Sequence, residues 1–202
     1  NKPSILHTLL QAKKSHIFDK IVVSSDSNKI INMSKRKVDY IVKRPKKLST
    51  AKASKIFAIR HALIQAESYF KKKFDIVIDL DVTSPLRNIT DIIKAKNKFV
   101  RNKYESLISV CHSRKNPYFN VVEKTKKGLK LVRETKKNYV RRQDAPDVYD
   151  INASIYIWKR MALLNTNKVI TNKTGFYIMP KIRSIDIDDY FDFKLVELLM
   201  KR

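Results

Sequence analysis

The 202 residues are enough for one domain with a core of its own, and a hydrophobic content of 43% argues against a disordered chain. No apolar run reaches the roughly 18 residues that a membrane span needs, which excludes a membrane-spanning class. A single cysteine, Cys111, excludes an internal disulfide framework and is typical of a reducing compartment, so we expect a cytoplasmic protein.

The charge is strongly basic, with 44 Lys and Arg against 19 Asp and Glu and a formal net charge of +25. Three interpretations stay open: a nucleic-acid partner, small anionic substrates, or solvated lysines on helix faces in a composition rich in Ile, Asn and Lys. The basic residues are scattered along the chain and form no aromatic-interleaved block. Nucleic-acid binding is therefore disfavoured as the primary role.

The first half of the chain alternates helical and strand patterns. Helices are expected near residues 3–15, 28–35, 50–70 and 88–101, and strands near 20–25, 39–43 and 75–81. In the third helix we expect Ser49 or Thr50 as the cap, and in the fourth Asn88 or Thr90. This alternation predicts an α/β fold with a mainly parallel sheet and right-handed crossovers.

The second half is richer in short strands. We expect strands at 107–110, 151–158, 176–179 and 184–188, a hairpin formed by 118–122 and 129–132, and helices at 159–164 and after Asp189. In the last helix one apolar face is expected to pack inward, formed by Phe193, Val196, Leu199 and Met200. The simplest organisation is one domain over residues 1–202 with a β-rich excursion at about 112–150.

A strand-end site is predicted at residues 75–87. Asp79 and Asp81 are two residues apart, so in a strand they point to the same face. Hydroxyls and a planar cation follow where the strand ends, from Thr83, Ser84 and Arg87. Ligands bind outside the carboxyl ends of strands in open α/β sheets. A buried strand followed by an ordinary turn is the alternative.

A second acidic pattern, Ser184-Ile-Asp-Ile-Asp188, alternates strictly. In extended geometry Asp186 and Asp188 share one face, and two carboxylates near a strand end suit Mg²⁺. Where a nucleoside triphosphate is bound, such a metal bridges phosphate oxygens. The alternative is that Asp188 or Asp189 caps the last helix, which is compatible with metal binding.

A third group of polar residues lies in and after the excursion. Arg142 and Gln143 belong to a cluster of donors suited to carboxylate or phosphate, although a solvated basic loop is the plainer interpretation. Tyr149, Asn152 and Tyr156 are polar positions on an otherwise apolar strand and suggest a wall that faces a sugar.

Taken together, these motifs resemble the acylneuraminate cytidylyltransferases, the CMP-sialic acid synthetase family, over essentially the whole chain. The matching segments, in the family's order, are 23–27, Arg44-Pro45, 61–63, 83–87, 142–144, Tyr149 with 152–156, and 184–188. Each segment is weak alone, and the combination is specific.

The resemblance implies a nucleotide-diphospho-sugar-transferase-like, Rossmann-like α/β fold. It implies that CTP and a nonulosonic sugar acid, a nine-carbon 2-keto acid, give a CMP-sugar and pyrophosphate with Mg²⁺ as cofactor, for surface glycan synthesis. It also implies a homodimer in which the excursion at about 112–150 reaches the partner's site.

The family's functional residues carry over onto matching positions. Asp186 and Asp188 match the metal-binding aspartates, and together with Arg142 they are the expected catalytic residues. The expected substrate-binding residues are Ser25, Asp26, Asp81, Thr83, Ser84, Arg87, Gln143, Tyr149, Asn152 and Tyr156.

Two departures from the family pattern matter. The family begins with a strand and a phosphate loop of the type P-A-R-x-G-S-K. Here the chain starts just after it and has only two glycines, so we expect a truncated sequence with low activity. Where sialic acid members commonly have Leu-Gln-Pro-Thr, this chain has Leu80-Asp-Val-Thr83. Asp81 therefore indicates a different sugar acid, such as legionaminic acid, or joins the metal site.

Three competing hypotheses stay open at this point. The chain could be a catalytically dead remnant or a basic nucleic-acid-binding module. Within enzymes, the runner-up is a cytidylyltransferase for an eight-carbon sugar acid, which the match at 142–156 argues against.

Overall fold

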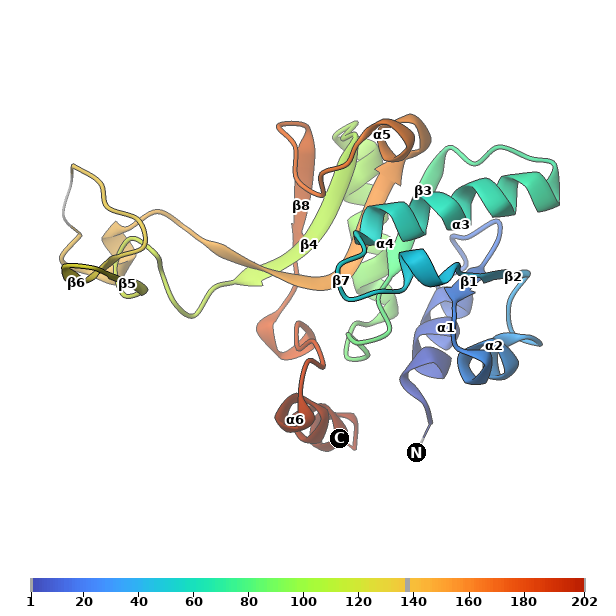
Figure 1. Cartoon of the computed structure of the whole chain (residues 1–202), viewed down its shortest axis with the longest axis horizontal. Helices are drawn as coiled ribbons and strands as arrows, with labels where there is room; N and C mark the ends of the chain where they lie inside the picture. Colours follow the sequence, from blue (N-terminus) through green and yellow to red (C-terminus); the bar gives the residue numbers. More distant parts are fainter. Residues whose placement is uncertain (1, 137–138, 202) are drawn as a thin grey trace.

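The computed structural model describes residues 2–136 and 139–201 and shows an α/β fold with one long extension (Figure 1). The helices are α1 (Ser4–Ser15), α2 (Asn28–Ser34), α3 (Lys55–Phe70), α4 (Ile89–Arg101), α5 (Arg160–Asn165) and α6 (Tyr190–Met200), with 3-10 turns η1 (Lys46–Leu48), η2 (Arg142–Asp144) and η3 (Lys181–Arg183). The strands are β1 (Val22–Ser25), β2 (Tyr40–Lys43), β3 (Ile76–Leu80), β4 (Ser106–His112), β5 (Val122–Thr125), β6 (Gly128–Leu131), β7 (Tyr149–Lys159) and β8 (Thr174–Ile178).

The central sheet has the strand order β3-β7-β4-β8. β4 and β8 are parallel, while β7 is antiparallel to both β3 and β4, so β3, β4 and β8 share one direction. The expected α/β class with a mainly parallel sheet is confirmed, and β7 is its antiparallel member.

A second sheet contains the parallel strands β1 and β2. Within residues 2–136 and 139–201, β1 pairs only with β2, and β3 pairs only with β7. One edge of β1 and one edge of β3 therefore have no strand partner in the described part of the chain.

Two helices cover opposite faces of the central sheet. α4 begins with a capping box in which Asn88 caps the Asp91 amide, and its buried Ile92 and Phe99 pack with Leu107 of β4. On the other face α3 packs against Ile108, the next residue of β4. Successive residues of a strand point to opposite faces, so the alternation of β4 separates the two cores.

Several expected boundaries differ from the structure. α3 begins at Lys55 with Ser54 at the N-cap position, five residues after Thr50, because the 3-10 turn η1 follows Pro45. The first hairpin strand was expected at 118–122 but begins at Val122.

The C-terminal region also departs from expectation. Residues 184–188 form no strand, and of the α6 face expected to pack inward only Val196 is buried. Phe193 and Met200 are exposed, because α6 lies apart from the central sheet (Figure 1).

The β5–β6 hairpin lies at the far end of the extension, residues 112–150, well away from the sheet (Figure 1). Gly128, the first residue of β6 after the turn, has a φ of 114°, a backbone conformation that favours glycine. No helix in the described ranges combines the length and the apolar character that a bilayer crossing requires.

Candidate active site

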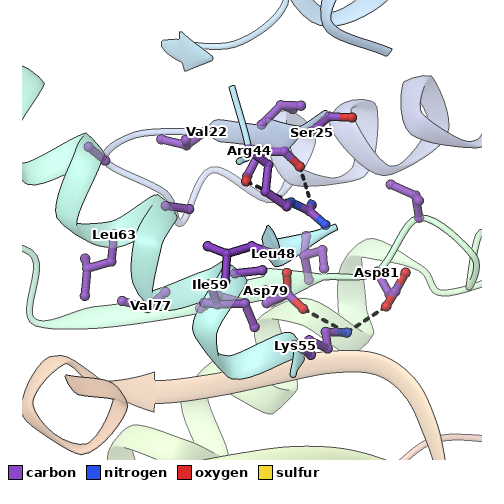
Figure 2. Close-up of a pocket in the computed structure, with 18 of the residues that line it drawn as sticks. Val22, Ser25, Arg44, Leu48, Lys55, Ile59, Leu63, Val77, Asp79 and Asp81 are labelled. Atoms are coloured by element: carbon purple, nitrogen blue, oxygen red, sulfur yellow. Dashed lines mark hydrogen bonds and ion pairs between the residues drawn. The ribbon is translucent and has the colours of Figure 1, made fainter. Parts of the chain in front are cut away.

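A cavity of about 620 Å³ lies between β1, β3 and α3, and it runs along both strands and along α3 from Lys55 to Ala66 (Figure 2). Its lining includes the carboxyl ends of both strands, with Ser25 and Asp26 at the end of β1 and Asp81 after β3. One end of the cavity therefore lies at the strand ends, where the sequence predicted a ligand site.

The β1 side of the pocket is held by hydrogen bonds to backbone and hydroxyl groups. Arg44 donates from Nε to Ser24 Oγ at 3.3 Å. Ser25 is buried, and its Oγ accepts from the Ser27 amide at 3.1 Å. Asp26 is exposed at the rim, and its carbonyl oxygen accepts from Lys43 Nζ at 2.7 Å. The Asp26 carboxylate itself thus faces the solvent side.

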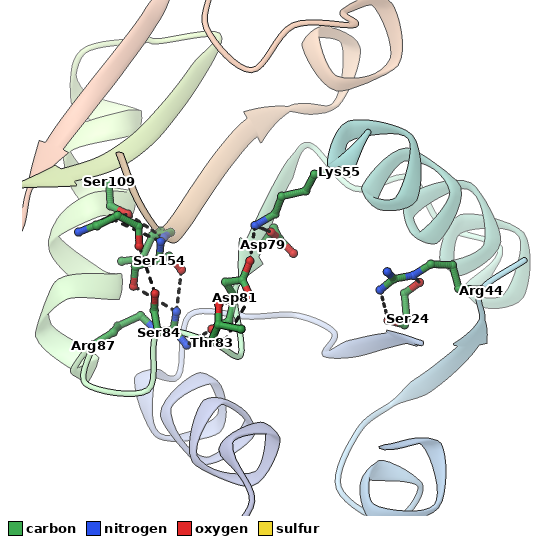
Figure 3. Close-up of polar contacts among 12 residues, drawn as sticks. Ser24, Arg44, Lys55, Asp79, Asp81, Thr83, Ser84, Arg87, Ser109 and Ser154 are labelled. Atoms are coloured by element: carbon green, nitrogen blue, oxygen red, sulfur yellow. Dashed lines mark hydrogen bonds and ion pairs between the residues drawn. The ribbon is translucent and has the colours of Figure 1, made fainter. Parts of the chain in front are cut away.

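The β3 side carries two carboxylates bridged by one lysine (Figures 2 and 3). Lys55 Nζ lies 3.0 Å from Asp79 Oδ2 and 2.6 Å from Asp81 Oδ2. Because one lysine contacts both, the prediction that Asp79 and Asp81 share a face is confirmed. Tyr156 lies opposite Asp79 in the β3–β7 register, and Lys55 Nζ lies 4.1 Å from its ring centre.

These contacts shift the ionisation of both partners. Burial opposes the charge of Lys55, but Asp79 and Asp81 outweigh it and raise the lysine's pKa above its ordinary value. Burial also opposes ionisation of Asp81, but the charge of Lys55 and hydrogen bonds from Lys55 and Thr83 lower its pKa. Both groups are therefore charged near neutral pH.

The turn after β3 is built on buried hydrogen bonds (Figure 3). Thr83 donates from Oγ1 to Asp81 Oδ1 at 3.0 Å. Ser84 is fully buried and donates to the Asn152 carbonyl at 3.1 Å. Asn152 is itself buried and accepts from Ser109 Oγ at 2.6 Å. Ser84 and Asn152 thus join the turn to β7.

Arg87 lies beneath this turn, with 1% of its surface exposed. Its guanidinium donates to the Ser154 carbonyl at 2.6 Å, to Thr8 Oγ1 at 3.2 Å and to the Asp81 carbonyl at 3.1 Å. Burial lowers the pKa of Arg87 to about 10. In the described structure Arg87 supports the turn from within, and its expected contact with substrate stays a prediction.

Asp186 approaches the same turn from the C-terminal region. The Ile187 amide donates to the Thr83 carbonyl at 3.0 Å, and the nearby Thr83 hydroxyl partly offsets the rise in the pKa of Asp186. Burial and, to a smaller extent, the charges of Asp81 and Asp188 raise the pKa of Asp186. Asp186 and Asp81 therefore belong to one electrostatic cluster.

The residues present fit a hard cation. Asp186 Oδ1 is buried and has no hydrogen-bond partner among the described residues, and Asp188 adds a second, exposed carboxylate nearby. No group of three or more His, Cys, Asp or Glu side chains in ranges 2–136 and 139–201 forms a metal cluster. Two carboxylates supplemented by substrate phosphate oxygens are typical of Mg²⁺.

The capping alternative is also realised, by the next residue. Asp189 accepts from the Asp192 amide at 2.9 Å and forms a capping box at the start of α6. The Asp188 amide donates to Asp192 Oδ2 at 3.2 Å, so the Asp188 carboxylate is not consumed by the cap. Capping and the expected metal role therefore coexist.

The predicted residues of the extension lie elsewhere. Arg142 and Gln143 line a separate cavity of about 280 Å³, where Arg142 donates to the Ser113 carbonyl at 2.7 Å. Tyr149 lies at the base of the extension, with its ring centre 4.9 Å from that of His112. The structure does not bring Arg142 or Gln143 into the lining of the main pocket of their own chain.

Sequence reasoning overlooked Lys55. Its signal was its position, because a lysine in the first turn of a helix is unfavourable to the helix dipole and suggests an acidic partner. Arg44 was noted only as part of a motif, although it lines the pocket.

The chain is similar to known proteins over nearly its whole length. A model of the cytidylyltransferase family matches residues 1–195. The chain is 42% identical over 198 residues to the post-translational flagellin modification protein B of Campylobacter coli, covering 98% of this chain and 83% of the relative. It is 40% identical over 197 residues to the CMP-N,N'-diacetyllegionaminic acid synthase of Campylobacter jejuni, covering 97% of this chain and 83% of the relative.

A solved structure of a CMP:2-keto-3-deoxy-manno-octonic acid synthetase complexed with CTP is similar in fold, with a TM-score of 0.65 at 14% identity, covering 100% of this chain and 88% of that one. The structure of a 2-C-methyl-D-erythritol 4-phosphate cytidylyltransferase from Francisella tularensis is also similar in fold, with a TM-score of 0.64 at 14% identity. The match covers 96% of this chain and 87% of that one. The family match over nearly all residues, together with these relatives, shows that the chain belongs to the cytidylyltransferase family.

Proposed function

We propose that the protein transfers the cytidylyl group of CTP to a nonulosonic sugar acid and releases pyrophosphate. The observation that carries the proposal is the cluster that Asp81, Thr83 and Asp186 form at the carboxyl end of β3, beside the cavity that Asp81 lines. The sequence similarity to a CMP-N,N'-diacetyllegionaminic acid synthase supports the substrate class.

In the proposed reaction the anomeric hydroxyl oxygen of the sugar acid attacks the α-phosphorus of CTP. One oxygen–phosphorus bond forms, the bond from the α-phosphorus to the bridging oxygen breaks, and pyrophosphate leaves. The hydroxyl proton passes to solvent water as the new bond forms. The pocket orients the two reactants, which is the main contribution that a protein makes to phosphoryl-type transfer.

Asp186 and Asp188 would hold Mg²⁺, which supplies charge neutralisation at the phosphates when bound. Asp81 would accept hydrogen bonds from N–H or O–H groups of the sugar acid. A carboxylate acceptor at Asp81 is compatible with a diacetamido acid of the legionaminic type, because the two acetamido groups of such an acid each carry an N–H donor.

The extension supports a proposed homodimer. Leu129, Val122 and Val140 are exposed apolar residues there, with 73%, 52% and 84% of their surface accessible. Arg142 and Gln143 are too far along the extension to join their own pocket, and we propose that they serve the pocket of a second copy. We place the reaction in the cytoplasm, where CTP is available.

Pyrophosphate release tests this function. The protein, expressed from its complete reading frame, is incubated with CTP, Mg²⁺ and a panel containing N,N'-diacetyllegionaminic, pseudaminic and N-acetylneuraminic acids and an eight-carbon 2-keto acid. Release is expected only when a nine-carbon acid and Mg²⁺ are both present. No release across the panel would contradict the proposal, and release with the eight-carbon acid alone would move it to that substrate.

A further inference from the structure

Lys55 occupies a position that the family match does not explain by itself. It starts α3 and points across the pocket to β3, where it reaches Asp79 Oδ2 at 3.0 Å and Asp81 Oδ2 at 2.6 Å (Figures 2 and 3). Asp79 Oδ2 is buried and makes no hydrogen bond to the described residues, so its contact with Lys55 is a purely ionic one. The lysine is therefore the compensating charge for a buried carboxylate oxygen.

The lysine is also fixed by an aromatic platform. Its Nζ lies 4.1 Å from the ring centre of Tyr156, a distance at which the ring face attracts a cation. Tyr156 is buried and lies parallel to Trp158, with their ring centres 5.7 Å apart. Lys55 thus approaches the carboxylates from a rigid support on β7.

On the pocket side, the charge of Asp79 and Asp81 is balanced by Lys55. Among the described residues, Lys55 is the cation that forms an ion pair with Asp79 or Asp81. Arg87 lies behind the turn and bonds the Asp81 carbonyl, and Arg44 is turned toward Ser24 on the opposite wall. Without Lys55, the two carboxylates would face a pocket proposed to take anions with only the buried Arg87 behind the turn as a compensating charge.

We propose that Lys55 is a positioning residue that adapts an acidic pocket floor to anionic substrates, by cancelling charge on Asp79 and Asp81 and holding Asp81 in place. The inference rests on the proposed function, because it takes CTP and a sugar acid as the ligands. Lys55 acts through the two aspartates, and its role is electrostatic and geometric.

Binding of Mg²⁺-bound CTP, measured by titration calorimetry on the protein expressed from its complete reading frame, tests the inference. Lys55→Met should weaken binding about tenfold or more, the size of a unit-charge interaction across roughly 10 Å at an effective dielectric constant near 20. Lys55→Met combined with Asp79→Asn restores the net charge of the trio and should return the dissociation constant to within about threefold of the original.

Lys72→Met is the matched control, because Lys72 pairs with Asp19 at 3.2 Å on the exposed surface. The same change of charge there should leave CTP binding unaltered. Circular dichroism of each variant reports whether it is folded. If Lys55→Met alone is unfolded, the double variant, in which the net charge of the trio is restored, is compared with the original protein instead.

The outcomes separate the inference from the function on which it rests. If the original protein binds CTP and Lys55→Met binds it equally well, the inference is wrong while the proposed function stands. If the double variant is folded but binds no better than Lys55→Met, Lys55 contacts the substrate directly, and the positioning role is wrong. A protein that binds no CTP overturns both.

Discussion

Asp186 is the residue on which the proposed chemistry most depends. Its Oδ1 atom is buried without a hydrogen-bond partner in the described structure, and its pKa is raised mainly by burial. Asp186→Asn keeps the shape and removes the charge, so activity in the pyrophosphate assay should fall by at least about a hundredfold. The melting temperature should change little or rise, because burial opposes the charge that is removed.

Asp189→Asn is the matched control, because Asp189 caps α6 through the Asp192 amide. Asparagine is an equally good N-cap, so this variant should keep both activity and stability. Unchanged activity in Asp186→Asn would reject the metal role.

At the scale of single residues, local periodicity correctly predicted that the carboxylates of Asp79 and Asp81 lie on one face. The two-residue spacing of Asp79 and Asp81 fixes their shared face in any strand, and the structure confirms it through Lys55. The lysine itself could not be predicted, because its contact depends on where α3 begins and how it packs. The burial of Arg87 was equally hidden, since it depends on bonds to α1 and β7, 67 or more residues away in sequence.

At the scale of elements, a buried ion pair joins α3 to α5. Glu67 accepts from Arg160 Nε at 2.7 Å and Nη2 at 2.9 Å, and also from the Phe74 amide at 3.1 Å. The Arg160 hydrogen bonds, against the opposing effect of burial, lower the pKa of Glu67 from 4.5 to about 2. Since the folded pKa lies below the unfolded one, this stabilisation is complete above about pH 4.5 and is lost as the pH falls toward 2.

Glu67→Gln should therefore lower the free energy of unfolding at pH 7 by about 1–3 kcal/mol. Between pH 5 and pH 3 the variant should lose less stability than the original protein does. Urea unfolding at these pH values measures both effects. The exposed pair Glu105–Lys173 provides the control, because Glu105→Gln should change stability by no more than about 0.5 kcal/mol. Parallel pH profiles of the Glu67 variant and the original would contradict the assignment.

The helix α4 was predicted more accurately than α3. It was expected near residues 88–101 with Asn88 or Thr90 as its cap, and the structure has it at Ile89–Arg101 with Asn88 as the cap. Residues 184–188 alternate like a strand, yet they meet the turn after β3 through the Ile187–Thr83 hydrogen bond and pair with no strand. Alternation records which residues face the core, and it does not by itself supply a pairing partner.

At the scale of the whole molecule, the extension predicts an oligomer. We expect sedimentation velocity to show a dimer, and Leu129→Asp to raise its dissociation constant about tenfold or more by placing a charge among exposed apolar residues of the hairpin. Ile64→Asp, at an exposed position of α3 away from the extension (Figure 1), should leave the dimer intact. A monomer at all concentrations, or a dimer indifferent to Leu129→Asp, would contradict this arrangement.

The alternation of helices and strands was sufficient to predict the α/β class, and the predicted residues Ser25, Asp26 and Asp81 line the cavity at the carboxyl ends of β1 and β3. The alternation did not predict that β7 lies antiparallel between β3 and β4. That pairing joins residues 76–80 and 106–112 to residues 149–159, which follow the extension in the sequence. Pairings between strands that are far apart in the sequence cannot be predicted from local patterns, whereas the residue pattern within each strand can be recognised locally.

The most direct test of the central claim is mass spectrometry of the product formed from CTP, Mg²⁺ and N,N'-diacetyllegionaminic acid by the protein expressed from its complete reading frame. The account predicts a CMP-sugar at the summed mass of CMP and the acid less one water, together with an equal amount of pyrophosphate. Conversion should be lost in Asp186→Asn and kept in Asp189→Asn. Absence of any CMP-sugar with this acid and with every other nonulosonic acid of the panel would contradict it.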